Sequence, residues 1–441
     1  MKFTPDQIAQ LAPDAASDKA GQKLAVSTKW PKLHQNELAL WGECQGSGKK
    51  PYKTAVDLSI LAFKCSCPSR KFPCKHSIGL LYLFSAQQQQ FIEAPLETYV
   101  QEWLDSRAKR AEKAAVRAEE KEKKPVDEQA QQKRQQAREK KVSSGIQELR
   151  IWIKDLIRTG VINVPQEQYH FTQTIRARMV DAQANGLANR LKDIEAIAYY
   201  KDGWQRSLLQ KLSRLYLLTE AYQNKEQLSL EWQEEIKNLI GWSHSKEEVL
   251  SLPPVSDQWL AWSRTVENDG NINTVRTWLY GIQHKRYALL LDFHANGQVA
   301  STPLSPGQIM QAQLCYYPGL NPLRALIKKQ ENGTQLSSLE TVHNGLEAIS
   351  AVHARALAQN PFTDRIPLLI GGLRLLRIDG AFYIQDHRQC ISPIGNSEAE
   401  CWVIYSISGG NTFDAFLIRE DEQVQLHSLF VQQQLYTIKW V

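Results

Sequence analysis

Residues 65–76 read Cys-Ser-Cys-Pro-Ser-Arg-Lys-Phe-Pro-Cys-Lys-His. This stretch places three thiols and one imidazole close together along the chain, in two pairs that are separated by a six-residue spacer. Zinc prefers four tetrahedral ligands of this kind, and the spacer is long enough to fold back on itself. The sequence therefore predicts one Zn²⁺ site, made by Cys65, Cys67, Cys74 and His76.

Such a site is closed, because the protein supplies all four ligands and leaves no position for water or substrate. A closed site of this kind is structural, and we expect the folding of the surrounding module to depend on the metal. Two free cysteine pairs beside an incidental histidine are the alternative interpretation. A redox disulfide is disfavoured, since a bridge across one intervening residue is strained.

The pattern Cys-x-Cys, spacer, Cys-x-His resembles the SWIM-type zinc finger of bacterial SWIM domain-containing proteins. Residues 41–48 and 51–52 before the pattern and residues 77–81 after it are similar to the same family. A further stretch, residues 177–187, resembles a second part of that family. The resemblance implies zinc, a role in binding DNA or protein, and an association with AAA ATPases and von Willebrand A proteins.

Positive charge is concentrated in two segments of the chain. Residues 106–142 contain 13 Lys/Arg and 7 Asp/Glu, and residues 44–90 contain 7 Lys/Arg and one acid, Asp57. Each segment carries +6, as does the whole chain, so the remainder sums to −6. This asymmetry indicates that the N-terminal third meets an anionic partner, either nucleic acid or an acidic protein face.

Two binding roles remain open from the sequence. In the first, the finger binds nucleic acid through phosphate contacts, although no base-reading residue can be named. The basic residues expected to make these contacts are Lys49, Lys50, Lys53, Arg70, Lys71 and Lys75. In the second, the finger and the C-terminal β region dock partner proteins, and the chain is an interaction scaffold.

Composition and periodicity divide the chain into five segments with an α+β organisation. We expect an N-terminal helix and lead-in at 1–37, a small ββα zinc-binding module at 38–91, a charged linker, helical or disordered, at 92–142, a helical domain at 143–250, and a mainly β domain of unknown role at 251–441.

Turn signals support the β prediction for the C-terminal region. Asn296-Gly297, Asp379-Gly380 and Gly409-Gly410 each lie between apolar runs and predict hairpins, because glycine accepts positive φ. A helix around residues 322–329 is expected to interrupt the sheet. In the N-terminal region, Cys44 is expected to be a small buried hydrophobic side chain, rather than a residue that supports the metal ligands or a spare thiol.

The sequence favours binding over catalysis. We find no His-Glu-x-x-His, no readable Ser/His/Asp order and no paired carboxylates in an interpretable setting. Residues 46–50 resemble a fragment of a phosphate-binding loop but lack its first glycine and its hydroxyl residue. No apolar run reaches the roughly 20 residues that span a bilayer, and no signal peptide is evident. We therefore expect a soluble, cytoplasmic binding protein.

Overall fold

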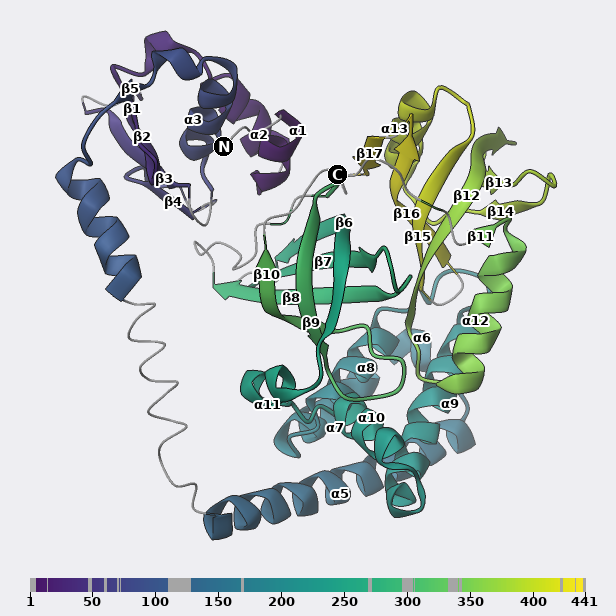
Figure 1. The fold of residues 1–441 in the computed structure, drawn as a ribbon. Coiled ribbons are helices and arrows are strands. Elements are labelled where there is room, and N and C mark those ends of the chain that lie inside the picture. The colour runs from purple at the N-terminus through teal and green to yellow at the C-terminus, as the bar shows by residue number, and fades with distance from the viewer. Residues whose placement is uncertain are drawn as a thin grey trace.

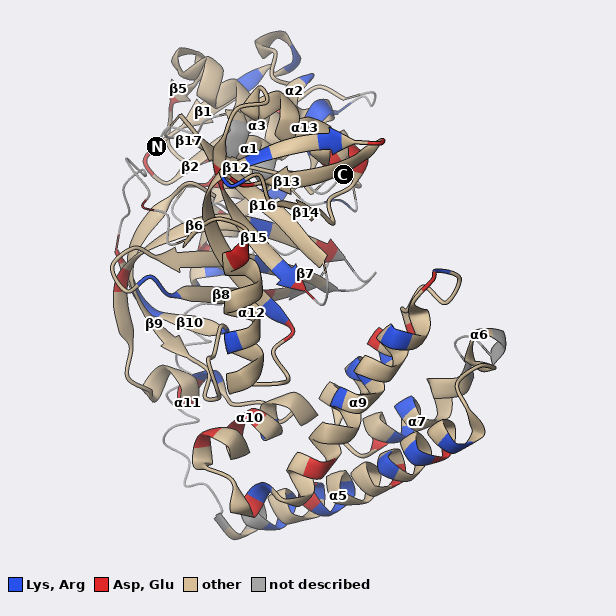
Figure 2. Cartoon of the chain, turned by 90° about the vertical axis from the view of Figure 1, so that its right-hand side faces the viewer, with Lys and Arg blue, Asp and Glu red and all other residues tan. Residues whose placement is uncertain are grey.

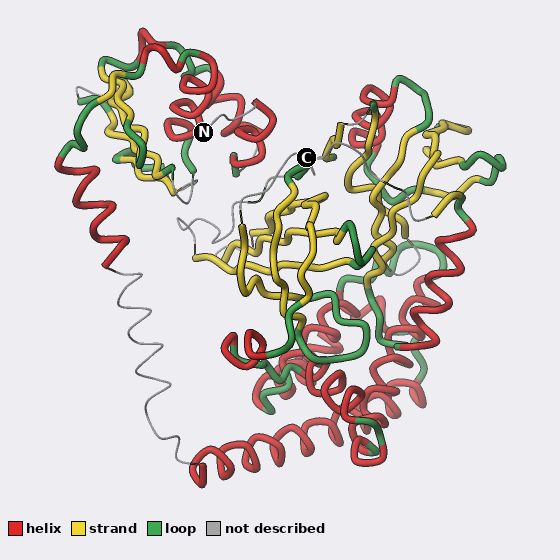
Figure 3. The backbone as a smooth tube through the Cα atoms, viewed as in Figure 1, coloured by secondary structure: helices red, strands yellow, loops and turns green. Residues whose placement is uncertain are grey.

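The computed structural model describes residues 5–13, 15–46, 50–58, 62–69, 71, 73–109, 128–167, 170–268, 272–295, 304, 306–331, 340, 343–420, 423–432 and 434–438. It contains an N-terminal α/β module, a group of helices and a β region (Figure 1). Figure 3 shows the strands gathered in the N-terminal module and in the C-terminal half, with helices between them in the chain. None of the described helices combines the length and apolar character that crossing a membrane requires.

The N-terminal module is built on a five-stranded sheet in the order β4-β3-β2-β1-β5. Its strands are β1 (Lys32–Gln35), β2 (Ala39–Cys44), β3 (Tyr52–Asp57), β4 (Ala62–Cys65) and β5 (Ile92–Glu93), and its helices are α1 (Pro5–Leu11), α2 (Ala15–Gln22) and α3 (Lys75–Ala86). The module is larger than the predicted ββα unit, because residues on both sides of 38–91 contribute to it. The strand predicted across residues 52–63 is two neighbouring antiparallel strands, β3 and β4.

Both faces of this sheet are covered. Leu40 and Val56 face the core that contains α3, whereas the adjacent Trp41 and Ala55 pack against the helical residues 98–109. This alternation follows from the pleat, which points successive side chains to opposite faces. The sheet is therefore the central layer of a three-layer module.

The helices of residues 128–240 pack around one core (Figure 1). They are α5 (Glu128–Thr159), α6 (Val164–Glu167), α7 (His170–Asp181), α8 (Asn185–Glu195), α9 (Trp204–Gln223) and α10 (Leu230–Ile240). The short helix α11 (Lys246–Ser251) follows them and packs against the β region. The boundary expected at residue 142 is wrong, because it falls inside α5 and Val142 is fully buried in the core. Residues 110–127 of the predicted linker lie outside the described residues. Charges of both signs are mixed along α5, α7 and α9 (Figure 2).

A close approach between helices explains Gly186. A Cβ atom at this position would lie 2.2 Å from the Leu239 carbonyl oxygen and 2.7 Å from the Ile240 carbonyl carbon. The start of α8 therefore packs directly on the end of α10. Any side chain larger than hydrogen at residue 186 must push these two helices apart.

Gly186→Ala is expected to destabilise the chain by about 1–3 kcal/mol, the usual cost of overpacking. Urea or thermal unfolding of the full chain would measure this change. Lys192→Ala, at an exposed position of the same helix, is the control and should change stability by no more than about 0.5 kcal/mol. Equal unfolding midpoints for the two variants would contradict the close packing.

The first part of the β region is a small barrel. Its strands are β6 (Val255–Asn268), β7 (Ile272–Gly281), β8 (Tyr287–Ala295), β9 (Ile309–Tyr316) and β10 (Ala325–Glu331), in the antiparallel order β10-β9-β6-β7-β8. The two ends meet, because Leu289 forms a parallel bridge with Arg324 and its N–H donates to the Leu323 carbonyl at 2.7 Å. The long strand β6 pairs with β9 and β7, with a bulge between Ala261 and Ser263. This order and closure are those of an OB-type barrel.

The second part is a seven-stranded sheet that packs on the barrel. It contains β11 (His343–Asn344), β12 (Arg365–Ile378), β13 (Ala381–Gln385), β14 (Ile391–Pro393), β15 (Phe413–Glu420), β16 (Gln423–Val431) and β17 (Gln434–Thr437), together with the helices α12 (Glu347–Gln359) and α13 (Glu398–Ser408). The rings of Trp262 in β6 and Phe416 in β15 stack at 4.8 Å. The indole of Trp262 thus joins the barrel to the second sheet.

The structure tests the predicted turns one by one. Asp379-Gly380 is confirmed as a hairpin between β12 and β13. The hairpin predicted at Gly409-Gly410 is wrong, because Gly409 ends α13 in a left-handed conformation. The helix expected around 322–329 is also wrong, since Ala325 begins β10 and pairs with β9. Tertiary pairing decided the conformation of this short segment, as it often does for strands. Asn296-Gly297 lies outside the described residues.

Candidate metal centre

The four predicted ligands meet where a strand ends and a helix begins. Cys65 is the last residue of β4, and Cys67 follows two residues later. Cys74 is the N-cap of α3, and His76 lies in the first turn of that helix. The four possible ligand atoms all lie within 4.8 Å of one another. Among the described residues, these four form the group of cysteine, histidine or acidic side chains that lie close enough together to bind one metal ion.

The distances fit one tetrahedral ion. The Sγ atoms of Cys65 and Cys74 each lie 3.8 Å from Nδ1 of His76. With Zn–S near 2.3 Å and Zn–N near 2.0–2.1 Å, a tetrahedral sulfur–nitrogen edge is about 3.6 Å. Cys74 and His76 are buried and Cys65 and Cys67 are half-buried. The arrangement therefore suits a closed Cys₃His site for a divalent ion such as Zn²⁺.

Three neighbours orient the ligands. The Thr54 hydroxyl lies 3.3 Å from Cys65 Sγ, and the Ser77 hydroxyl lies 3.6 Å from Cys74 Sγ. The Tyr52 ring packs 4.8 Å from the His76 ring. Hydroxyl and ring contacts of this kind fix the ligand side chains and stabilise thiolate charge. These three residues were not predicted, because strand register rather than sequence spacing places Thr54 and Tyr52 here.

The protonation of the thiols shows why the cluster suits a cation. A hydrogen bond from Cys65 lowers the pKa of Cys74 to about 3, and the same bond raises the pKa of Cys65. Burial raises the pKa of Cys67. Three sulfurs this close cannot all ionise unless a positive charge offsets their repulsion. A bound dication would supply that charge and hold all three as thiolates.

Cys44 lies near the cluster but outside it. Its side chain is fully buried and packs in the core that contains Leu40 and Phe63. Burial raises the pKa of this thiol to about 11. The prediction that Cys44 is a small buried residue is confirmed.

The six predicted basic contacts flank the metal ligands in the sequence, and four of them lie in the described part of the chain. Lys50, Lys53, Lys71 and Lys75 are exposed, whereas Lys49 and Arg70 lie outside the described residues. The Lys53 ammonium lies 5.1 Å from the Tyr99 ring centroid. The sequence did not single out Tyr99.

Lys64 and Tyr99 add an aromatic element to the basic group. The ammonium of Lys64 donates to the Tyr99 carbonyl at 2.9 Å and lies 5.8 Å from the centre of its ring. Only the packing of residues 98–109 on the sheet brings this ring to the two lysines. No spacing in the sequence signals the contact.

Comparison with known families accounts for two parts of the chain. Residues 52–84, which include all four ligands, match the family model of the SWIM zinc finger. Residues 137–240 match the family model described as the SWIM-associated four-helix bundle domain. These two regions are similar to domains of SWIM-type zinc finger domain-containing proteins. The SWIM finger thus sits in the N-terminal module, and the stretch 177–187 lies at the α7–α8 junction of the SWIM-associated bundle. Searches of curated proteins and of solved structures gave no match.

Proposed function

We propose that the SWIM finger binds one structural Zn²⁺ through Cys65, Cys67, Cys74 and His76, and that the module held by this ion binds nucleic acid. In this proposal the chain is a cytoplasmic binding protein without catalytic activity. The observation that carries the proposal is the unbalanced positive charge around the finger. Phosphate contacts by lysine supply the sequence-independent part of nucleic-acid affinity.

The charge is unbalanced because the segment exposes no carboxylate of its own. Asp57 is the single acid of residues 44–90, and only 6% of its surface is exposed. Its carboxylate also lies 3.9 Å from the Arg107 guanidinium. The described part of this segment therefore exposes lysines and no carboxylate, and Glu43, one residue outside the segment, lies opposite Lys53 in the sheet.

The metal would position two of these lysines. Lys71 lies in the loop between the two ligand pairs, and Lys75 lies between Cys74 and His76. A single ion that joins both pairs fixes the backbone on either side of each lysine. Zinc would thus act on binding indirectly, by holding the basic loop in one conformation.

Charge reversal at Lys71 and Lys75 tests this proposal. The double variant Lys71→Glu/Lys75→Glu is expected to weaken binding of a fluorescein-labelled DNA or RNA duplex by about tenfold or more at 50 mM salt. The slope of log affinity against log salt should flatten by about 2, since about 0.9 counterion is released per phosphate contact. Fluorescence anisotropy between 50 and 200 mM salt measures both quantities.

The matched control reverses two exposed lysines of the same module, Lys19 and Lys23. Lys19→Glu/Lys23→Glu changes the net charge equally and should have a smaller effect on affinity and slope. Identical losses in both variants would mean that only overall charge matters. Undetectable or salt-independent binding by the unmodified protein would reject nucleic acid as the partner of the finger.

A protein-docking role is the second candidate, and one surface feature favours it. Helix α13 exposes Trp402, Val403 and Tyr405, which are 45%, 39% and 45% exposed. The Trp402 ring also contacts Phe382, and the Arg377 guanidinium lies over both rings. Exposed aromatic side chains beside arginine are enriched at protein interfaces. The partners implied by resemblance, an AAA ATPase or a von Willebrand A protein, belong to this candidate.

A further inference from the structure

A large cleft lies where the SWIM-associated bundle meets the barrel. Its volume is about 1210 Å³. Helices α8 and α9 form one wall, and residues 317–324, which connect β9 to β10, form another. Segment 360–365 and the edge of β15 and β16 complete it. A cleft of this size is large enough for a ligand of several rings.

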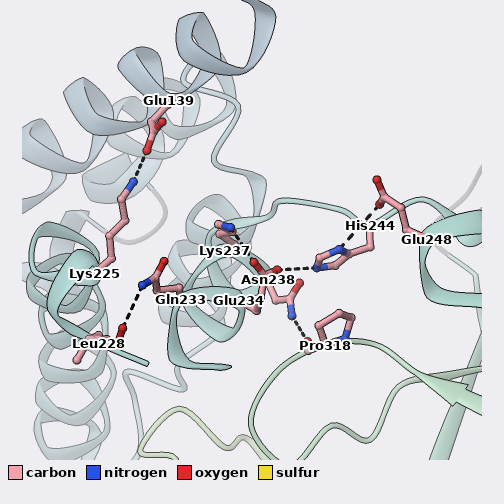
Figure 4. A network of polar contacts seen from close by, with 10 residues as sticks. All are labelled: Glu139, Lys225, Leu228, Gln233, Glu234, Lys237, Asn238, His244, Glu248 and Pro318. Carbon is pink, nitrogen blue, oxygen red and sulfur yellow. Dashed lines mark hydrogen bonds and ion pairs between the residues drawn. The ribbon is translucent and has the colours of Figure 1, made fainter. Parts of the chain in front are cut away.

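Partly buried polar contacts hold the walls of the cleft together. The Glu235 carboxylate accepts from the Leu320 N–H at 3.0 Å and from the Asn360 side-chain amide at 2.8 Å. Asn238 donates to the Pro318 carbonyl at 2.6 Å, and Figure 4 shows this bond from α10 to the barrel loop. Phe362 is buried in the core of the bundle. The cleft is therefore a built feature of the fold.

The position of the barrel loop points to a class of ligand. Residues 317–324 join the fourth and fifth strands of the OB-type barrel, and this loop commonly binds oligonucleotides or oligosaccharides. The other surface on which such barrels commonly bind these ligands is the outer face of the second and third strands. Here Trp278 and Tyr280 of that face pack in one cluster with Leu369 and Phe416 of the second sheet. The loop connecting β9 to β10 is thus the uncovered ligand surface among the described parts of the barrel.

The side chains of the cleft favour an oligonucleotide over an oligosaccharide. Arg190 and Arg214 both reach Asp364, with nitrogen–oxygen distances of 3.2 Å and 3.5 Å. The guanidinium groups are mostly buried, whereas 50% of the Asp364 side chain is exposed. Paired guanidinium groups suit the geometry of a phosphate. The Asp364 carboxylate therefore occupies the position that an incoming phosphate would take.

Stacking and amide groups complete the recognition chemistry. The Arg324 guanidinium lies 4.2 Å above the Tyr317 ring, which forms a flat surface beside the barrel loop. Asn189, Gln210 and Gln423 also line the cleft and offer both donors and acceptors, as base edges require. Base stacking on aromatic and arginine planes is the usual basis of single-strand binding.

The remaining charged side chains of the cleft add no net positive charge, because two are basic and three are acidic. Lys211 and Arg365 are basic, and Asp193, Glu235 and Glu420 are acidic. Arg365 pairs with Glu420 at 2.9 Å. The cleft is therefore not a strong general attractor of polyanions. Its affinity must come from a few placed contacts, in contrast to the basic surface of the finger.

We propose that this cleft binds a short single-stranded nucleic acid. Its bases stack on Tyr317 and Arg324, and one backbone phosphate displaces Asp364 from Arg190 and Arg214. The site is separate from the SWIM finger and does not rest on the function proposed for it. A neutral oligosaccharide would leave the two guanidinium groups without an anionic partner from the ligand.

Two substitutions with opposite expected effects test the proposal on the full chain. Arg190→Gln/Arg214→Gln is expected to weaken binding of a fluorescein-labelled single-stranded octanucleotide by about tenfold, because the phosphate loses both guanidinium partners. Asp364→Asn is expected to tighten binding by about threefold, because the internal competitor loses its charge. A purely structural role of this ion pair would shift both variants in the same direction.

Two controls separate the cleft from other sites. Arg178→Gln removes an arginine of the bundle that pairs with Glu148 outside the cleft, and it should leave octanucleotide affinity unchanged. The finger variant Lys71→Glu/Lys75→Glu should retain the response to Asp364→Asn. Photo-crosslinks from a thiouridine-containing octanucleotide are expected in residues 317–324. Crosslinks confined to the finger, absence of octanucleotide binding, or affinity for an oligosaccharide alone would overturn the proposal.

Discussion

Cys74→Ser is expected to abolish metal binding and unfold the N-terminal module. Cys74 is buried at the N-cap of α3, and its sulfur lies within ligand distance of the other three groups. Structural zinc sites contribute roughly 10–16 kcal/mol of apparent binding free energy, which becomes folding free energy when the site forms only in the folded state. Incubation with a chelator should have the same effect on the unmodified protein.

Elemental analysis and hydrogen exchange measure this outcome. The unmodified protein should contain one equivalent of zinc, and peptides from β2 to α3 should be protected from exchange. Both properties should be lost in Cys74→Ser, whereas the bundle keeps its protection. Cys44→Ala is the matched control, because it truncates a buried cysteine of the same module outside the ligand group. A Cys74→Ser protein that keeps a full equivalent of zinc and the same protection would disprove the assigned site.

Phe362→Ala is expected to cost about 3–5 kcal/mol, the usual range for truncating a buried phenylalanine. The Phe362 side chain comes from the C-terminal region, yet it is 3% exposed and belongs to the core of the bundle. Its ring meets the Trp232 ring edge to face at 6.4 Å. The substitution leaves a cavity at the joint between the two regions, so α10 should exchange its amide hydrogens faster.

Urea unfolding and hydrogen exchange check this second expectation. Phe293→Ala is the control, since the Phe293 side chain is 58% exposed and its loss should change stability by no more than about 0.5 kcal/mol. A free energy of unfolding for Phe362→Ala equal to that of the control would show that the bundle and the C-terminal region are not joined through this residue.

The strength of the local sequence signals varies along the chain for physical reasons. The metal ligands could be predicted from the sequence, because zinc requires cysteine or histidine side chains and these lie close together along the chain. The helical region predicted at residues 143–250 could be identified from its apolar periodicity. Helix α13 was missed, although Ser397 and Glu400 form a capping box that signals a helix start. The strand β10 was read as a helix, since a short segment has no decisive periodicity.

The sequence by itself determined the metal ligands, the helical middle region and the uneven charge, because each depends on residues that are near neighbours in the chain. Only the tertiary structure decided the closed barrel, the burial of Phe362 in the bundle and the pairing of Asp364 with Arg190 and Arg214. These features join residues more than 30 positions apart, up to 174 for Arg190 and Asp364. Contacts at such separations depend on how whole layers pack, and no local pattern encodes them.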